Sequence, residues 1–341
     1  MKSAQITDPS IVSLSEVPIP VCRDGDVLIQ LGACGICGSD ITNIFGSSCK
    51  PSIKIGHEIS GKVVKVGFGV KDFQVGDRVF VHHHTSCNDC YLCKNGNETM
   101  CERFTDSLYP NGLSEMFLLP KWNVVQGCLF KIPDSMSFEN ASLIEPFACC
   151  VRAWKKAPKD VTSVAIFGLG TIGIFHAFLG RIFGAEKIFC IDMNEFRLGF
   201  CRQRGIGLGF NTSDDYAGSI FSETDGVGVD LAIVAAPDMS AIKDAIRIVR
   251  KGGSILIMGE PEKSDVVDID LSVVYGKEIS IFTSYAASNN DVQHAFDLIK
   301  SKKIDVSQII THRFSLDECE KALDVAKQRR DSIKVVIVNA D

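Results

Sequence analysis

The fold of the second half of the chain is decided by one stretch, residues 163–173, which reads SVAIFGLGTIG. Its first five residues form an apolar run typical of a buried strand, and apolar residues then recur at helical spacing up to Ile182. Further strand-like runs cover 187–191, 230–234, 254–258 and 278–282, with helical segments at 195–204 and 240–250. Strands that alternate with helices predict an α/β fold with a doubly wound parallel sheet.

The glycines of this stretch fit the pattern G-x-G-x-x-G, which is typical of a strand that turns into a helix at a dinucleotide. Gly168 would permit the tight turn, Gly170 would let the backbone approach a pyrophosphate, and Gly173 would let the helix pack closely on the sheet. Thr171 and Ile172 lie between these glycines. The stretch therefore predicts a dinucleotide site, and the alternative is the same strand and helix without a ligand.

An acidic residue at the end of the next strand indicates which dinucleotide binds. Asp192 would accept hydrogen bonds from the adenosine ribose, and its carboxylate would repel a 2′-phosphate. Arg197 follows shortly after it, and an arginine nearby can accommodate that phosphate. We therefore expect NAD as the cofactor, with NADP as the less favoured alternative.

The composition of the chain excludes several classes of protein. Its 341 residues suggest two domains, and 45% hydrophobic with 23% charged residues is an ordinary globular profile. The net charge of −6 offers no basic surplus for nucleic acid or an anionic membrane surface. Residues 1–20 lack the pattern of a signal segment, and glycines and charges interrupt the longest apolar region, 161–191. We expect a cytoplasmic protein with no nucleic-acid or membrane partner.

Four of the 14 cysteines lie close together in the sequence. Their spacing lets one loop wrap a zinc ion with four thiolates, from Cys87, Cys90, Cys93 and Cys101. Such a site has no open coordination position, so its zinc would be structural. The alternative is an iron–sulfur cluster, although the spacing matches neither ferredoxin pattern. Because the chain is long and has no secretion signal, we expect the other cysteines to be reduced.

The first third of the chain is predicted to be rich in β-strands. Residues 26–31, 61–66 and 78–81 are short β-branched runs with turn signals between them. We expect a barrel-like antiparallel arrangement of these strands. Beyond residue 284 the pattern is mixed, with a helix that begins at the capping box of residues 315–318 and a last strand over 333–338.

Three short motifs, GICGSD, GHE and EP, could supply a second metal site. Their candidate ligands are Cys37, His57, Glu58 and Glu145. Taken singly, each of these residues is more often a core or surface residue than a ligand. Together they offer the three protein ligands that a catalytic zinc needs, with one coordination position left open.

With these motifs in this order, the sequence resembles the zinc-dependent medium-chain dehydrogenase/reductase family of alcohol and polyol dehydrogenases, in particular its sorbitol and threonine dehydrogenase branch. The resemblance covers essentially the whole chain. It implies a Rossmann dinucleotide-binding domain over residues 149–284. It also implies a β-rich, GroES-like catalytic domain that is discontinuous, over residues 1–148 and 285–341, and a homo-oligomer, either a dimer or a tetramer.

The resemblance implies a role for each candidate ligand. Cys37 and His57 match the family's catalytic zinc ligands, and Glu58 matches the acid that binds this zinc or lies just behind it. Glu145 stands where liver-type alcohol dehydrogenases have a second cysteine ligand, and a glutamate there is similar to the polyol dehydrogenase branch. Whether Glu58, Glu145 or a water completes the zinc shell stays open at this point. Asp40 is a candidate to orient the ligands, or only a local turn cap.

The resemblance also points to residues that handle the substrate. Ser39 matches the hydroxyl that contacts the reacting alcohol and starts a proton relay. Where many relatives have a histidine that passes the proton on, this chain has Thr42, which cannot hold a proton as imidazole does. Ala286 stands where polyol dehydrogenases often have a substrate-contacting arginine, which favours another polyol, a cyclitol or a simpler secondary alcohol. The run His82–His84 is expected to line the entry to the four-cysteine loop.

The activity that the resemblance implies is the NAD(H)-dependent interconversion of a secondary alcohol and its ketone, by zinc-alkoxide formation and hydride transfer. It implies a small-molecule substrate and two zinc ions per chain. The alternatives are a threonine-type amino-alcohol dehydrogenase, a nucleotide-binding protein without catalysis, and a zinc-independent quinone or enoyl reductase. Fold alone does not decide among them, but the two metal motifs disfavour the last.

Overall fold

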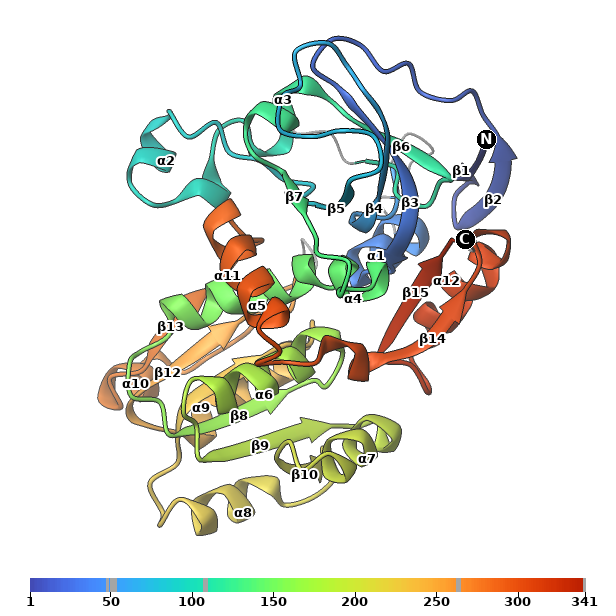
Figure 1. Cartoon of the computed structure of the whole chain (residues 1–341). Coiled ribbons are helices and arrows are strands. Elements are labelled where there is room, and N and C mark those ends of the chain that lie inside the picture. Colours follow the sequence, from blue (N-terminus) through green and yellow to red (C-terminus); the bar gives the residue numbers. More distant parts are fainter. Residues whose placement is uncertain (47–48, 50–53, 107–109, 262–264, 340–341) are drawn as a thin grey trace. The chain divides into compact units, whose positions relative to one another are not determined.

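The computed structural model describes residues 1–46, 49, 54–106, 110–261 and 265–339, and the chain divides into two compact units. Unit 1 consists of Met1–Ala148 and Ala287–Asp341, and unit 2 consists of Cys149–Ala286. The chain therefore leaves unit 1 once and later returns to it (Figure 1). The candidate metal ligands lie in unit 1, and the glycine motif lies in unit 2.

Unit 2 is built on a six-stranded parallel sheet. Its strands are β8 (Ser163–Phe167), β9 (Lys187–Asp192), β10 (Leu208–Asn211), β11 (Val229–Val234), β12 (Val249–Ile257) and β13 (Ser280–Thr283). Their order is β10-β9-β8-β11-β12-β13, which reverses direction beside β8. This order confirms the predicted α/β fold with a doubly wound Rossmann sheet.

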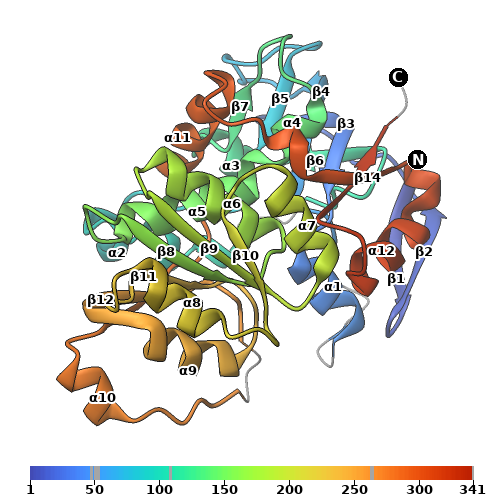
Figure 2. The ribbon, with the colours of Figure 1, turned by 90° about the horizontal axis from the view of Figure 1, so that it is seen from below.

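Helices cover both faces of this sheet. Figure 2 shows α6 (Thr171–Ile182) and α7 (Glu195–Gln203) over one face, and α8 (Tyr216–Glu223) and α9 (Met239–Ile248) over the other. Because both faces are covered, the central strands are largely apolar, and every residue of β8 is buried. The short helix α10 (Leu271–Gly276) precedes the last strand, β13.

One boundary in unit 2 differs from the prediction. The helix expected to reach Arg250 ends at Ile248, and β12 begins at Val249, several residues before the expected start of that strand. Val249 is extended and pairs with β11. Its branched Cβ favours a strand, and this preference outweighs the helical pattern that precedes it.

Unit 1 contains a β-hairpin and a larger mixed sheet. Its strands are β1 (Lys2–Asp8), β2 (Ile11–Glu16), β3 (Val27–Gly35), β4 (Glu58–Val66), β5 (Arg78–Val81), β6 (Met116–Leu119), β7 (Leu129–Lys131), β14 (Ile310–Phe314) and β15 (Lys334–Val338). β1 pairs with β2, and the larger sheet has the order β14-β15-β3-β4-β5-β7, with β6 also paired to β3. Within the described part of this sheet, every pairing is antiparallel except that of β14 with β15.

Mostly short helices connect these strands. They are α1 (Gly38–Phe45), α2 (Tyr91–Lys94), α3 (Lys121–Val125), α4 (Phe138–Ser142), α11 (Asn289–Lys300) and α12 (Cys319–Gln328), and α5 (Ile144–Lys156) begins in unit 1 and continues into unit 2. The predicted capping box is present, because the Ser315 N–H donates to the Glu318 carboxylate at 3.1 Å. It opens a 3₁₀ turn, and α12 follows that turn. Within the described ranges, no helix has the length and apolar character that crossing a membrane requires.

Candidate functional site

Four cysteines converge in the lobe formed by residues 87–101 of unit 1. The Sγ atoms of Cys90 and Cys93 are 3.5 Å apart, those of Cys90 and Cys101 are 3.9 Å apart, and those of Cys87 and Cys93 are 4.0 Å apart. All four sulfurs lie within 4.8 Å of one another, and all are free thiols. The four cysteines that are close together in the sequence are therefore also close together in space, as a zinc site requires.

These sulfurs fit a tetrahedral zinc ion. Four thiolates at about 2.3 Å from zinc would lie about 3.8 Å from one another, close to the separations observed. The Cys90 N–H donates to Cys87 Sγ at 3.3 Å, and the Arg103 N–H donates to Cys101 Sγ at 3.4 Å. Amide donors of this kind favour thiolate over thiol, and they lower the pKa of Cys90 to about 6. The lobe thus offers four sulfur ligands and leaves no position for a substrate.

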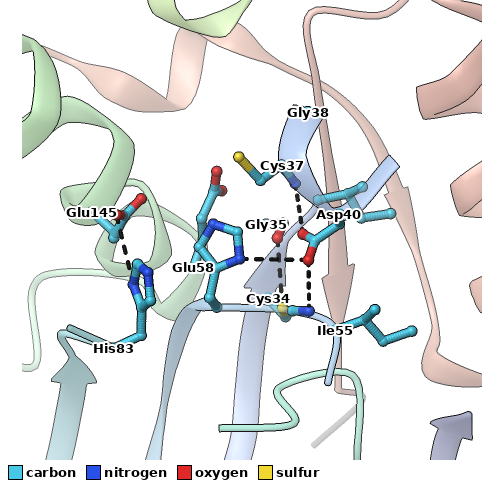
Figure 3. A network of polar contacts seen from close by, with 12 residues as sticks. Cys34, Gly35, Cys37, Gly38, Asp40, Ile55, Glu58, His83 and Glu145 are labelled. Atoms are coloured by element: carbon cyan, nitrogen blue, oxygen red, sulfur yellow. Dashed lines mark hydrogen bonds and ion pairs between the residues drawn. The ribbon is translucent and has the colours of Figure 1, made fainter. Parts of the chain in front are cut away.

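A second group of potential ligands meets where β3 ends and β4 begins (Figure 3). One ligand atom from each of Cys37, His57 and Glu58 lies within 4.8 Å of the others. Cys37 is the N-cap residue of α1, and Glu58 is the first residue of β4, opposite Gly35 of β3. His57 and Glu58 are 9% and 1% exposed. The pairing of β3 with β4 is therefore what brings the GICGSD and GHE motifs together.

Asp40 holds this group in place from α1 (Figure 3). Its Oδ1 accepts the Gly56 N–H at 3.0 Å and lies 3.4 Å from His57 Nδ1. Its Oδ2 accepts the Cys37 N–H at 3.0 Å. Because Nδ1 faces Asp40, Nε2 is the nitrogen of His57 that is left for a metal. A carboxylate in this place fixes the orientation of a metal-binding histidine, so Asp40 orients the ligands as well as capping the turn.

The charges around His57 fit a bound cation. Burial lowers the pKa of His57, but the Asp40 carboxylate and the Cys37 thiolate outweigh it and hold the pKa well above its usual value. Burial raises the pKa of Asp40, but His57 and the amide donors hold it below its usual value. A metal ion would take the place of the imidazole proton and offset the same anions. The group is thus built to surround a positive charge.

Glu58 has a buried partner that no sequence motif indicated. The Nζ of Lys334, the first residue of β15, forms an ion pair with Glu58 Oε2 and donates to the Ile36 carbonyl at 3.0 Å. The side chains of Lys334 and Glu58 are 2% and 1% exposed. A buried carboxylate of the candidate site is therefore matched by a buried ammonium.

Glu145 lies beside a histidine rather than among these three residues (Figure 3). Its Oε1 is 3.6 Å from His83 Nδ1, and the ring of His83 packs against that of His57 with 4.6 Å between centroids. Burial lowers the pKa of His83 well below its usual value, so this imidazole is neutral. The run His82–His84 was expected at the entry to the four-cysteine lobe. His83 instead reaches the second group, because it follows β5, which pairs with β4.

The two residues of the predicted proton relay lie in α1. Ser39 is half-buried, and Thr42 is exposed one turn further on. The Thr42 hydroxyl donates to the Gly38 carbonyl at 3.2 Å. A hydroxyl oxygen that donates one hydrogen bond still has lone pairs that can accept another. Thr42 can therefore take part in a relay while it stays bonded to its own helix.

In unit 2, the glycine motif makes the turn from β8 to α6. Gly168 has a φ of +90°, and a Cβ on Gly173 would overlap the Gly168 carbonyl oxygen. Gly170 is the N-cap residue of α6, and the first heavy atom that a Cβ there would meet is 3.9 Å away. Thr171 and Ile172 are the first two residues of the helix. The open space at this helix N-terminus fits a pyrophosphate.

Asp192 ends β9 and contacts this loop. Its Oδ2 accepts the Leu169 N–H at 2.6 Å, and its Oδ1 accepts the Asn194 N–H at 2.8 Å. Arg197 Nη1 lies 3.9 Å from the same Oδ2 and also approaches the loop at Gly170. One carboxylate and one guanidinium therefore flank the glycine turn, and both are residues that the sequence singled out for the cofactor.

Three features of this structure together define a class of protein: a parallel sheet with an open glycine turn, a closed four-cysteine lobe, and a buried Cys/His/Glu group. The class is that of the metal-dependent oxidoreductases that use a dinucleotide. Comparison with known families agrees. The alcohol dehydrogenase GroES-like domain matches residues 23–134. The zinc-binding dehydrogenase domain matches residues 171–301.

Relatives match over nearly the whole chain. L-threonine 3-dehydrogenase of Escherichia coli O1:K1 / APEC is 30% identical over 336 residues, which cover 95% of each protein. Sorbitol dehydrogenase of Bacillus subtilis (strain 168) is 29% identical over 348 residues, which cover 99% of this chain and 97% of that protein. A solved structure described as a short chain alcohol dehydrogenase from E. coli CFT073, complexed with NADH, has a TM-score of 0.87 at 28% identity and 99% coverage of both chains.

The chain belongs to the zinc-binding medium-chain dehydrogenase family, which confirms the resemblance seen in its sequence. It is an oxidoreductase of the zinc-dependent alcohol and polyol dehydrogenase type.

Proposed function

We propose that the protein interconverts a secondary alcohol, such as a polyol or a cyclitol, and its ketone with NAD(H). The observation that carries the proposal is the convergence of Cys37, His57 and Glu58 at one buried point of unit 1, with Asp40 behind them. Three ligands of these types leave a coordination position for a substrate oxygen, which a four-thiolate site does not offer. We assign unit 1 as the catalytic domain and unit 2 as the dinucleotide-binding domain.

Two zinc ions per chain fit these residues. The four cysteines of the lobe would hold the structural ion. Cys37, His57 and Glu58 would hold the catalytic ion, with Glu145 or a water as the alternative to Glu58. When bound, the catalytic zinc would supply a Lewis acid for the alcohol oxygen. NAD would supply the acceptor for the hydride.

The side chains around this point are proposed to transfer the proton of the substrate and to orient the metal ligands. Ser39 would accept the hydroxyl proton of the substrate, and Thr42 would pass the proton outward. The exposure of Thr42 supports this role, because a proton that reaches its hydroxyl is next to solvent. Asp40 keeps the imidazole of His57 in one orientation throughout.

The coenzyme is proposed to be NAD rather than NADP. Asp192 places a carboxylate against the glycine turn, where it would repel a 2′-phosphate on the adenosine ribose. Arg197 Nη1 lies 3.9 Å from that carboxylate, which offsets part of the positive charge that Arg197 could offer to a 2′-phosphate. Gly168, Gly170 and Gly173, with the amides of the first turn of α6, would receive the pyrophosphate.

A threonine-type amino-alcohol dehydrogenase is the second candidate, and the identity with L-threonine 3-dehydrogenase favours it. The threonine at position 42, in place of a relay histidine, counts against it. A nucleotide-binding protein without catalysis is a third candidate. The complete ligand set and the orienting Asp40 count against that candidate, because a site that binds no substrate needs neither.

A substrate panel tests this proposal. Polyols, cyclitols, amino alcohols including threonine, and simple secondary alcohols are offered with NAD and with NADP, and reduced cofactor is measured by its absorbance. We expect turnover with a secondary alcohol and NAD, and metal analysis should find two zinc ions per chain. Turnover of threonine alone would favour the second candidate, and no turnover of any alcohol by the two-zinc protein would contradict the proposal.

We also propose a homo-oligomer, a dimer or a tetramer, in the cytoplasm. β13 is the outermost described strand of the unit 2 sheet, and Ile281 of this strand is 38% exposed. An apolar edge strand is suited to pairing with another copy. The 14 free cysteines fit a reducing compartment. Light scattering of the purified protein measures the number of chains.

A further inference from the structure

One lysine of unit 1 is buried next to the proposed catalytic site. Lys334 is 2% exposed, and lysine is almost never buried to this degree unless it is paired. Its Nζ forms an ion pair with Oε2 of Glu58 and donates to the Ile36 carbonyl at 3.0 Å. Glu58 is a candidate ligand, and Ile36 directly precedes the ligand Cys37. Both partners of Lys334 therefore belong to the site or to the peptide that enters it.

Strand pairing explains how this lysine reaches Glu58. β3 lies between β15 and β4, and its Gly35 pairs with Val336 on one side and with Glu58 on the other. A Cβ on Gly35 would lie 2.8 Å from Lys334 Cε and would overlap Glu58 Oε2. The absence of a side chain at Gly35 thus makes room for the lysine to cross β3. The glycine of the GICGSD motif and the lysine of the last strand form one arrangement with the glutamate.

Lys334 and Glu58 form a buried pair of opposite charges. A cation bound at Oε2 repels a second cation at the same oxygen. Only the other oxygen of Glu58 is then left to approach a metal.

We propose that Lys334 is a positioning residue of the catalytic metal site, an inference that rests on the function proposed above. Its ammonium holds Glu58 by Oε2, so that Glu58 binds the metal through a single oxygen. A carboxylate that used both oxygens would fill the position that the substrate needs.

The substitution Lys334→Met tests this role in the full-length protein with its catalytic zinc exchanged for Co²⁺. Methionine keeps most of the apolar stem and removes the charge. We expect the visible absorption of Co²⁺ to weaken as its coordination number rises. We expect kcat to fall by about 10–100-fold, as for other residues that orient metal ligands, with an unchanged KM for NAD. The control is Lys2→Met, which removes an exposed ion pair with Asp317 and should change neither quantity.

A folded Lys334→Met protein with the wild-type cobalt spectrum and kcat would overturn the proposal. If this variant does not fold, Glu58→Gln is compared with Glu58→Gln/Lys334→Met, in which both charges are removed. Because Lys334 acts through Glu58, the second substitution should leave the kcat and cobalt spectrum of Glu58→Gln unchanged, and a further loss would overturn the proposal. A wild-type protein that binds Co²⁺ but oxidises no alcohol would instead contradict the proposed function, so the two failures are distinguishable.

Discussion

Two groups of side chains in unit 1 are able to hold a metal ion, and they are built in opposite ways. The four-cysteine lobe takes all its ligands from residues 87–101, and Cys87 and Cys90 are only half-buried. The second group takes its ligands from the end of β3 and the start of β4, and His57 and Glu58 are buried. The lobe has sulfur ligands alone, whereas the second group mixes sulfur, nitrogen and oxygen.

The surroundings of the two groups differ as much as their ligands. Around the lobe, backbone amides donate to sulfur and complete a closed shell. Around the second group, charged side chains hold two of the ligands: Asp40 holds His57, and Lys334 holds Glu58. A closed shell needs only local structure to hold a zinc ion. A shell that keeps one position open needs other residues to fix its ligands, and these come from distant parts of the chain.

Removing a ligand of the second group should have the largest effect on turnover. We expect Cys37→Ser or His57→Ala to lower kcat by about a thousandfold or more, because several kcal/mol of Lewis-acid stabilisation are lost. Titration with NADH should show unchanged cofactor binding, since the glycine turn lies in unit 2. Metal analysis should find one zinc per chain in place of two. Wild-type turnover by either variant would mean that this group is not catalytic.

Removing the residue that orients His57 should have a smaller effect. We expect Asp40→Asn to lower zinc affinity or kcat by about 10–100-fold, because the imidazole is no longer held by a charged partner. Competition with a zinc-binding dye measures the affinity. The matched control is Asp26→Asn, because Asp26 is 8% exposed and also accepts amide hydrogens, at 2.8 Å from Lys121 and 3.0 Å from Arg23. An equal loss of zinc in both variants would show that Asp40 acts only through general stability.

The same comparison explains how much of the site could be predicted from the sequence. The four-cysteine lobe follows from spacing alone, because its ligands share one loop. The turn from β8 to α6 is also local, and the alternation of strands and helices around it was enough to predict the doubly wound sheet of unit 2. Cys37 and His57 are too far apart in sequence for a spacing rule. Their residue types suggested a metal site, and the resemblance to a family gave them their roles as ligands.

The residues that the sequence did not reveal are those that strand pairing brings in. Lys334 lies 298 positions from Ile36, which accepts its hydrogen bond, and nothing in the last strand marks it as part of a site. His83 was assigned to the lobe because it is near Cys87 in the sequence, but the pairing of β5 with β4 places it against His57. Predicting either residue would require the order and register of the strands.

Removing a ligand of the lobe should have the smallest effect on turnover and a clear effect on stability. We expect Cys90→Ser to lose the structural zinc and to lower the Tm by several degrees, since each kcal/mol lost shifts the Tm of a unit of this size by about 2–4 °C. The kcat per folded molecule should stay within a few-fold of wild type, because the second group shares no residue with the lobe. Cys22→Ser, at a half-buried cysteine outside both groups, is the control. If Cys90→Ser instead abolished turnover in folded protein at low temperature, the lobe would be part of the catalytic machinery, and the division between a closed structural site and an open catalytic one would be wrong.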